Sequence, residues 1–559
     1  MNVNIIKRAL VGIPIIAISM MISCSKVDVS ELENAKNEII DSLTNHIDSL
    51  NNVVAQRDSI SQSIPHSIIL LENCITLRDS YIAEIEFRVN PSHVNVDIKN
   101  FKLDHLSAET KGVSYITEPV NIKKVSVQKS KETYGSPQRG QYTMTIKDIN
   151  TNKDFTETLA IVYETYDAYN NRTEVSSDPF TVISAPASTL QQVHINTPDA
   201  VPVESKEEWV KDATMMVTDM YGNEIQSFST SIRGRGNSTW TFPKKPYALK
   251  LDSKEEVLGM PKHKRWVLLA NWMDRTLLRN DIAFEMGRRI MQWAPRGEFV
   301  ELYLNGKHLG NYYLCEQIKP DKNRVNIDEE NGGYILEFDT YGPNDEINYF
   351  YTPVKSYPVT IKEPDEELIT SWEHEGFLYI YNHLTYLENL LESDINNLTQ
   401  WAEIEGLIDV NSYIDWWLIH ELSHNWEPHH PKSCYMYKKQ NDKLFAGPLW
   451  DFDWGTFMLS EGVIANETLW YGYFFRYTEF KKAVKARWAE VKETLSDIDS
   501  YIEIQAAHIK ESNEVNIYKW PITEKINGDE NLSFDNAILQ MRKSYQIRFR
   551  VIDEYISEL

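Results

Sequence analysis

Apolar side chains change their spacing twice along this chain of 559 residues. Between residues 25 and 64 they recur at alternating intervals of three and four, which predicts an amphipathic helix. A second helical stretch is predicted beyond Pro65, with one stripe formed by Ile68, Leu71, Ile75 and Ile82. Charged residues interrupt both stripes. We therefore expect residues 24–83 to form a helical stalk, either a coiled coil that joins copies of the chain or a solvated helical linker.

Near Ile85 the spacing becomes that of strands. Six short runs rich in Val, Ile, Thr, Tyr and Phe follow within about a hundred residues, separated by polar or Gly/Pro-containing connections. This pattern predicts a small β-sandwich, similar to an immunoglobulin domain, over residues 84–186. No catalytic grouping occurs there, so a spacer and a binding module both remain open. Residues 184–192 are predicted to be a linker.

Residues 193–559 combine both kinds of spacing. Strand-like runs come first, at residues 193–197, 213–219, 246–252, 299–305, 311–318 and 332–339. Helical runs follow, at residues 371–393, 410–425, 477–495 and 532–556. A sheet-rich part followed by a helix-rich part predicts one large α+β domain with two lobes.

The N-terminus has the pattern of a secretory signal peptide, over residues 1–23. Lys7 and Arg8 precede an apolar run from Ala9 to Ile22, which is short for a membrane span. The residues that end at Cys24 resemble a bacterial lipobox, which predicts a lipid on Cys24; a simple N-terminal anchor helix is the alternative. A lipid would anchor the protein to a bacterial membrane outside the cytoplasm, at the outer membrane or cell surface.

The chain is acidic, with 57 Lys and Arg against 82 Asp and Glu and a formal charge of -25. This balance disfavours nonspecific nucleic-acid binding, which depends on neutralising phosphates with cations. The four cysteines match neither a zinc pattern nor a disulfide framework. Against this background, five cations fall within eighteen residues: Arg233, Arg235, Lys244, Lys245 and Lys250.

The two arginines flank and enter the stretch "GRGNSTW", residues 234–240. Lys250 follows on a predicted strand, on the side opposite the large apolar residues. Such a group of cations predicts a site for an anion, with lysine holding phosphate as a point charge. The alternative is a set of ordinary solvent-facing side chains.

Two further segments supply candidate carboxylates. Asn305–Gly306 predicts a hairpin turn within residues 303–318, and Glu316 lies near the end of that hairpin. Glu316 is expected either to line a cleft or to face solvent. Asp274 is predicted to cap a helix that begins near Arg275, and this helix is either part of the site or an ordinary surface helix.

The stretch "WDFDW" places Asp451 and Asp453 among aromatic residues, where a carboxylate must be paired or coordinated. Two hard oxygen ligands suit Mg²⁺ bridging phosphates, whereas a turn with capping aspartates is the alternative. Upstream, His420, Glu421 and His424 form an H-E-x-x-H pattern, which is typical of zinc hydrolases but equally compatible with a polar helix end.

Seven motifs together resemble the CotH family of secreted protein kinases, and they occur in the family's order from about Val193 to Leu559. They are "IRGRGNSTW", "PKKPYALKL", "LLANWMDRTLLRN", "GKHLGNYYLCEQI", "HELSHNWE", "YMYK" and "WDFDWG". The resemblance implies a remote, two-lobed protein-kinase-like domain over residues 193–559, with ATP and Mg²⁺ or Mn²⁺ between the lobes.

Carried over by position, Lys245 or Lys250 resembles the phosphate-holding lysine of the family. Asp451 resembles the metal-binding aspartate of the active site, with Asp453 close to it. Arg233, Arg235 and Glu316 would belong to the nucleotide site. The family's Asn-x-Asp segment corresponds to Asn425-Trp426-Glu427, so that Glu427 stands where an aspartate is familiar and would orient the acceptor hydroxyl. The added methylene matters, because in-line transfer tolerates only small displacements.

The sequence therefore predicts a surface-anchored kinase that transfers phosphate from ATP to Ser or Thr of an extracytoplasmic protein. A CotH-fold lipoprotein without transferase activity, acting as a binding module, is the first alternative. A zinc hydrolase that uses His420, Glu421 and His424 is the more remote one.

Overall fold

The computed structural model describes twelve stretches of the chain: residues 67–71, 74–77, 83–90, 98–106, 124–129, 141–147, 155–166, 172–184, 188–342, 348–365, 368–393 and 400–559. The predicted signal peptide, the lipidation site Cys24 and the first stalk helix lie outside these residues. Among the described helices, none combines the length and apolar character needed to cross a membrane.

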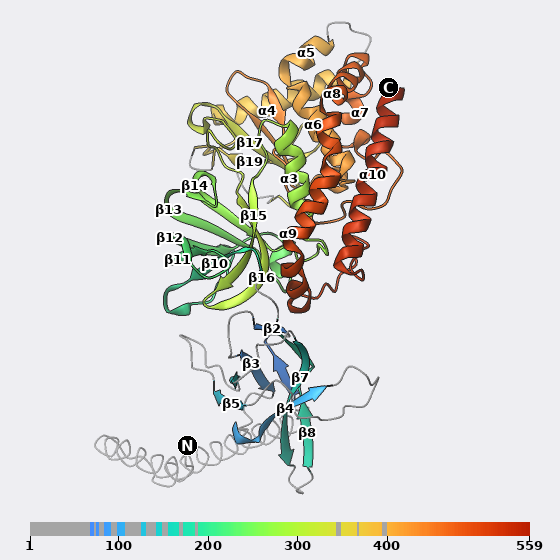
Figure 1. Ribbon diagram of the computed structural model, residues 1–559. Coiled ribbons are helices and arrows are strands. Elements are labelled where there is room, and N and C mark those ends of the chain that lie inside the picture. The colour runs from blue at the N-terminus through green and yellow to red at the C-terminus, as the bar shows by residue number, and fades with distance from the viewer. Residues whose placement is uncertain are drawn as a thin grey trace, which may run out of the picture.

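The N-terminal strands form two sheets (Figure 1). One sheet has the order β1 (Ser67–Leu70), β3 (Ala83–Asn90), β6 (Gln141–Lys147), β5 (Lys124–Lys129). The other has the order β2 (Cys74–Leu77), β9 (Phe180–Ser184), β7 (Phe155–Tyr166), β4 (Phe101–Leu106), with β8 (Arg172–Ser176) also paired to β7. Side chains from both sheets, such as Phe87 and Ile161, share one buried cluster, so the two sheets pack against each other.

The helix predicted to continue through Ile68 and Ile75 is wrong, because both residues lie in strands. Ile68 pairs with Val89 of β3 and is buried, whereas the next residue, Ile69, is 49% exposed. Pairing with β3 thus selects a period of two, and β-branched isoleucines suit a strand.

The next seven strands close into a barrel of order β10-β11-β12-β13-β14-β16-β15. Their bounds are β10 Gln191–Asn196, β11 Val210–Thr218, β12 Glu224–Gly234, β13 Tyr247–Val257, β14 Met260–Leu269, β15 Gly297–Leu304 and β16 Lys307–Glu316. Parallel pairing of β10 with β15 closes the ring, and alternate residues such as Leu249, Trp266 and Leu314 fill its interior. The predicted hairpin turn is confirmed, since Asn305 and Gly306 have φ values of 52° and 78° between β15 and β16.

The remaining chain is mostly helical and is built around one further sheet. This sheet has the order β18 (Tyr349–Tyr351), β19 (Pro358–Glu363), β17 (Tyr334–Phe338), β20 (Cys434–Lys438), β21 (Leu444–Ala446). The helices are α4 Glu375–Glu392, α5 Gln400–Leu407, α6 Val410–Leu422, α7 Tyr471–Phe474, α8 Thr478–Ser496, α9 Ile498–Lys519 and α10 Phe534–Glu558. We call residues 334–559 the helical half. All four predicted helical runs are confirmed, and the mixed composition agrees with the predicted α+β class.

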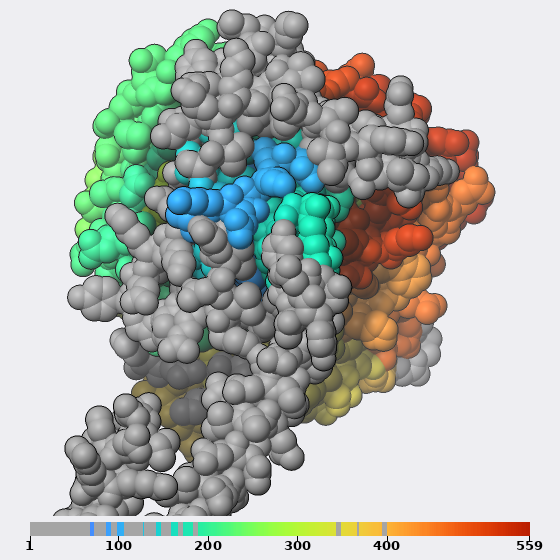
Figure 2. All heavy atoms as spheres, turned by 90° about the horizontal axis from the view of Figure 1, so that it is seen from below, coloured from blue at the N-terminus to red at the C-terminus, as the bar shows by residue number. Residues whose placement is uncertain are grey.

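Helix α3 (Arg279–Ile290) connects β14 to β15 and lies between the barrel and the helical half (Figure 1). Its buried residues share a cluster with Val267 and Cys315 of the barrel and with α6, in which ten residues from Tyr413 to Leu422 are buried. The barrel and the helical half therefore meet over a common apolar core. Figure 2 views the molecule from the end with the N-terminal sheets, coloured blue to cyan, and β2 lies in contact with α9 there.

Candidate active site

The glycine-rich stretch that links β12 to β13 is a compact loop, folded on its own tryptophan. A side chain at Gly234 would place its Cβ 2.3 Å from the Trp240 ring, so only glycine fits beneath that ring. Gly236 has a φ of 86°, a conformation that favours glycine. Lys245 donates to the Trp240 carbonyl at 2.7 Å and lies over the same ring, so it stabilises the loop.

Arg235 leaves this loop toward the helical half. Its guanidinium lies 5.3 Å from the centroid of the Trp450 ring, directly before Asp451. Its charge also acts on Tyr435 of β20 and on Cys315 of β16. Arg235 is therefore a cation at the junction of the barrel and the helical half.

Arg233, Lys250 and Arg265 share the outer face of the barrel, which we call the cation face. Lys250 pairs with Ser231 on one side and with Arg265 on the other, while Arg233 lies two residues beyond Ser231. Arg233 and Arg265 lie 4.7 and 5.2 Å from the ring of Trp209. The two cations therefore lie close together, and burial followed by the charge of Arg233 lowers the pKa of Arg265.

Two other candidates lie away from the cation face. Lys244 is fully buried, where its ammonium donates to the carbonyls of Ala270 and Asn311, and burial lowers its pKa to about 7. Glu316 neither lines the cation face nor faces solvent. It pairs in register with Trp266, whose side chain fills the barrel, so Glu316 points to the opposite side from Arg265.

Glu316 is instead fully buried in an ion-paired group. Arg296 donates to it from Nε and Nη2, each at 2.9 Å, and the Nε of Arg324 lies 3.4 Å away. This carboxylate is therefore already bound by cations of the chain, and a direct role in holding nucleotide would require it to give them up.

Four carboxylates form what we call the acidic cluster: Asp339, Glu427, Asp451 and Asp453. Asp339 follows β17 and accepts from the backbone N–H groups of Tyr341 and Ser433 at 2.7 and 3.2 Å. Asp451 accepts from the hydroxyl of Ser433 at 3.3 Å and has a φ of 68°, which is unusual for a residue with a side chain. The neighbouring Asp453 is hydrogen bonded to Asp451, and burial followed by the Asp451 charge raises its pKa far above the usual range.

Glu427 lies in the short 3-10 turn Glu427–His429 after α6 and is 8% exposed. Burial raises its pKa to about 8, with Asp451 and Asp339 adding to the shift and Lys432 opposing it. Its backbone N–H donates to Asn425 Oδ1 at 3.0 Å, while Nδ2 of Asn425 is buried without a partner. The structure thus leaves a free amide donor beside a carboxyl group that titrates near neutral pH.

Residues of α3 and its preceding loop hold the Asp451 segment in place. Asn280 accepts from the backbone N–H of Phe452 at 2.8 Å. Asp274 accepts a hydrogen bond from the backbone N–H of Arg279 at 2.8 Å. The guanidinium of Arg279 in turn donates to the carbonyl of Thr456 at 3.2 Å and to the carboxylate of Asp529 at 2.7 Å. The predicted cap is therefore wrong in its position: α3 begins at Arg279 with Leu278 as its N-cap, and Asp274 binds the first N–H of the helix from the preceding loop.

The H-E-x-x-H pattern has a structural role, and its geometry does not support the zinc hydrolase that was the more remote alternative. Helix α6 ends at Leu422, so His424, with a φ of 52°, does not continue the helix face of His420. Glu421 is fully buried, where it forms an ion pair with Arg548 at 2.5 Å and accepts a hydrogen bond from the backbone N–H of Ala465 at 2.6 Å. Among the described residues, no three His, Cys, Asp or Glu side chains are grouped as metal ligands.

A Mg²⁺ or Mn²⁺ site does not require three protein ligands, because such ions are commonly bound by one or two carboxylates together with phosphates and water. Asp451 and Asp453 fit that need. They are hard oxygen donors, and they are so close that one raises the pKa of the other. A divalent cation would relieve this repulsion, so the pair suits a metal bridged to phosphate.

Comparison with known proteins identifies the class. The family model described as CotH kinase protein matches residues 232–558. The chain therefore belongs to the CotH kinase protein family, and the matched region runs from the end of β12 to the end of α10. No curated protein matches the chain.

Solved structures resemble the chain only weakly. A structure concerning T cell activation by toxic shock syndrome toxin-1 is 9% identical, covers 21% of this chain and 98% of its own, and has a TM-score of 0.14. A marsupial T cell receptor is 9% identical over 36% of this chain and 98% of its own, with a TM-score of 0.15. BcpA, the major pilin subunit of Bacillus cereus, is 14% identical over 36% of this chain and 63% of its own, with a TM-score of 0.12.

Several residues around the site were not predicted from the sequence. Trp209 and Arg265 complete the cation face, and Asp339 completes the acidic cluster. Lys432 lies 4.8 and 5.3 Å from the rings of Tyr341 and Trp454, beside Glu427. Lys432 lies only five residues after Glu427, so the sequence alone could have suggested it. Asp339 follows a strand about ninety residues before Glu427, and only the fold brings the two carboxylates together.

Proposed function

We propose that the protein is an ATP-dependent kinase of the CotH type, anchored by a lipid on Cys24 and acting on Ser or Thr of an extracytoplasmic protein. The observation that carries this proposal is the position of Arg235 over the ring of Trp450, directly before Asp451 of the acidic cluster, in a chain of the CotH family. Because Arg235 leaves the glycine-rich loop, it joins the barrel to this cluster.

Phosphoryl transfer requires mainly positioning and neutralisation of charge. In this proposal Arg235 and the cation face hold phosphate oxygens of ATP between the barrel and the helical half. Asp451 and Asp453 hold Mg²⁺ or Mn²⁺, which would neutralise charge on the transferred phosphate when bound. Without a metal, the negative charges of the acidic cluster would repel the phosphates of a nucleotide, so the nucleotide is expected to bind together with the metal.

Glu427 is the candidate for orienting the acceptor hydroxyl and taking its proton. Its pKa of about 8 lies near the working pH, which suits a group that exchanges a proton during the reaction. Nδ2 of Asn425 is free to donate to the same hydroxyl or to the carboxylate. Trp426 and Trp454, which are 45% and 40% exposed, flank these groups and offer apolar surface to an acceptor chain.

The test is transfer of labelled phosphate from ATP, with Mn²⁺, to the protein itself and to a casein mixture. Asp451→Asn should abolish transfer and Mn²⁺-dependent nucleotide binding. Asp442→Asn, at an exposed turn of the helical half, is the matched control and should behave as the wild type. Transfer that persists in Asp451→Asn contradicts the proposal, and nucleotide binding without transfer in the wild type supports the binding module instead.

A further inference from the structure

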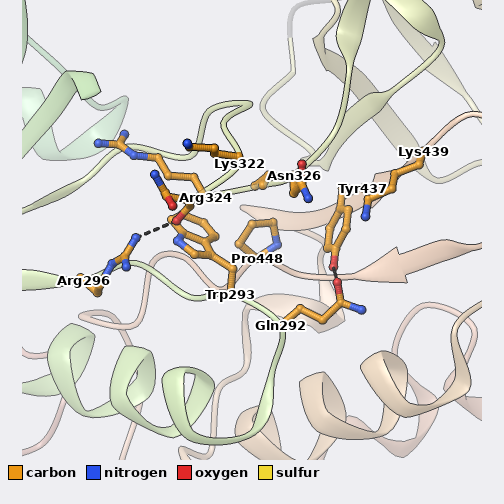
Figure 3. A pocket seen from close by; sticks show the side chains of 11 residues that line it. Gln292, Trp293, Arg296, Lys322, Arg324, Asn326, Tyr437, Lys439 and Pro448 are labelled. Atoms are coloured by element: carbon orange, nitrogen blue, oxygen red, sulfur yellow. Dashed lines mark hydrogen bonds between the residues drawn. The ribbon is translucent and has the colours of Figure 1, made fainter. Parts of the chain in front are cut away.

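A pocket of about 310 Å³ lies at the junction of the barrel and the helical half (Figure 3). Four segments line it: residues 292–296, which lead into β15; residues 322–326, which lead from β16 into the helical half; Tyr437 and Lys439 at the end of β20; and Pro448 after β21. A volume near 300 Å³ is at the small end of the range for ligand pockets.

The lining of this pocket is strongly cationic. Arg296, Lys322, Arg324 and Lys439 contribute to it, and no carboxylate does. The ammonium groups of Lys322 and Lys439 have no hydrogen-bond or ion-pair partner among the described residues, although the chain as a whole has a formal charge of -25. Lys322 and Lys439 thus line the same pocket from opposite sides, and Figure 3 shows Lys322 beside Arg324 and Lys439 beside Tyr437.

The buried group beneath the pocket adds to this excess of positive charge. Arg296 and Arg324 share one carboxylate, that of Glu316, so one positive charge has no counterpart within the group. Nη2 of Arg324 is buried without a partner, and so is Nε1 of Trp293. Buried donors of this kind normally find an acceptor, because leaving one unpaired costs on the order of 1–3 kcal/mol.

The pocket is separate from the proposed nucleotide site. The cation face is built on β12, β13 and β14, on the outer side of the barrel. The pocket lies next to β15, which is on the other side of β16 in the sheet, and its arginines bind Glu316, which points away from the cation face. A ligand in the pocket would therefore leave the Asp451 site open.

We propose that this pocket binds a phosphate monoester of a small polyol or sugar. The phosphate would accept from Lys322 and Lys439, since lysine ammonium groups recognise phosphate as point charges. The rings of Trp293, Tyr437 and Pro448 supply apolar walls for the organic part. Because the ligand would touch both the barrel side and the helical half, its binding stabilises their contact and raises the melting temperature.

The test measures binding of glucose 6-phosphate, inorganic phosphate and glucose by calorimetry and by thermal shift. Glucose 6-phosphate should bind more tightly than inorganic phosphate, and glucose should not bind. In Lys322→Ala/Lys439→Ala the affinity for glucose 6-phosphate should fall at least about tenfold, because each lost contact to a charged phosphate is worth that much. Trp293→Phe, which removes the indole N–H and leaves a smaller aromatic ring, should weaken binding in the same direction.

The controls separate this site from the active site. Lys211→Ala/Lys482→Ala removes the same charge from exposed positions and should leave the affinity unchanged. Asp451→Asn should keep glucose 6-phosphate binding, and Lys322→Ala/Lys439→Ala should keep Mn²⁺-dependent ATP binding. The proposal is overturned if glucose 6-phosphate does not bind, or binds equally to the control and to Lys322→Ala/Lys439→Ala; equal affinity for inorganic phosphate would overturn the sugar part alone.

Discussion

The buried pair of Glu421 and Arg548 gives the sharpest test of how the H-E-x-x-H pattern is used. In a zinc hydrolase, Glu421 would be a catalytic base, and Glu421→Gln would remove activity with little effect on folding. In this structure the same carboxylate anchors α6 to α10 and to the segment at Ile464–Ala465. Glu421→Gln is therefore expected to destabilise the protein strongly.

The magnitude follows from the contacts. Both side chains of the pair are fully buried, and Glu421 also accepts from the backbone N–H groups of Ile464 and Ala465 at 3.0 and 2.6 Å. A glutamine removes the negative charge and turns one acceptor into a donor that faces other donors. Breaking one partner of a buried pair costs about 3–5 kcal/mol, which is a large part of the 5–15 kcal/mol available to a typical domain.

The assay is urea unfolding followed by tryptophan fluorescence, with Glu405→Gln at an exposed position of α5 as the control. The double variant Glu421→Leu/Arg548→Met should lose less stability than the sum of its single variants, because neither charge is left alone. Wild-type stability in Glu421→Gln, together with one bound zinc per chain, would refute the structural role.

Three further predictions concern the site and its support. Glu427→Gln should lower the rate of phosphate transfer by about a hundredfold or more without weakening nucleotide binding, because general-base assistance is typically worth that factor. If parallel assays show that transfer and nucleotide binding fall equally, Glu427 does not act as the base. Burial lowers the pKa of His420 to about 3, so the stability from its neutral form is complete above pH 6.5 and is lost as the pH falls toward 3, with about 2 kcal/mol lost at pH 5. The free energy of unfolding should therefore fall less between pH 7 and pH 5 in His420→Gln than in the wild type, and an equal fall would contradict the assignment. Gly234→Ala should cost about 1–3 kcal/mol and weaken nucleotide binding through the displaced Trp240 ring, whereas Gly406→Ala, with open space around it, should have no such effect in the same thermal-shift series.

The sequence predicted those parts of the fold in which spacing and local geometry agree. The period of two in residues 246–252 and 311–318 and the Asn305–Gly306 turn identified barrel strands correctly. Helix α9 was not predicted, because its apolar residues form no clear stripe and its position depends on contacts with α10, α3 and the barrel. The stripe at Ile68 and Ile75 suited a helix, and only pairing with distant strands turned it into strands.

The site shows the same limit. The sequence drew attention to Arg235, Asp451 and Glu427, and the structure places all three near the junction of the barrel and the helical half. It could not indicate which face of a strand Glu316 occupies, because the register with Trp266 decides that. Nor could it show that Arg265 joins Arg233, since that contact forms across three strands through Trp209.

The positions of metal and nucleotide can be determined in a crystal of the protein soaked with Mn²⁺ and a non-hydrolysable ATP analogue, with the ion located by anomalous scattering. The account predicts one manganese peak at about 2.0–2.2 Å from carboxylate oxygens of Asp451 and Asp453, the near-octahedral geometry of a small hard cation. It also predicts phosphates within hydrogen-bond distance of Arg235. A manganese peak at His420 and His424, or a nucleotide bound away from Asp451, would contradict the account.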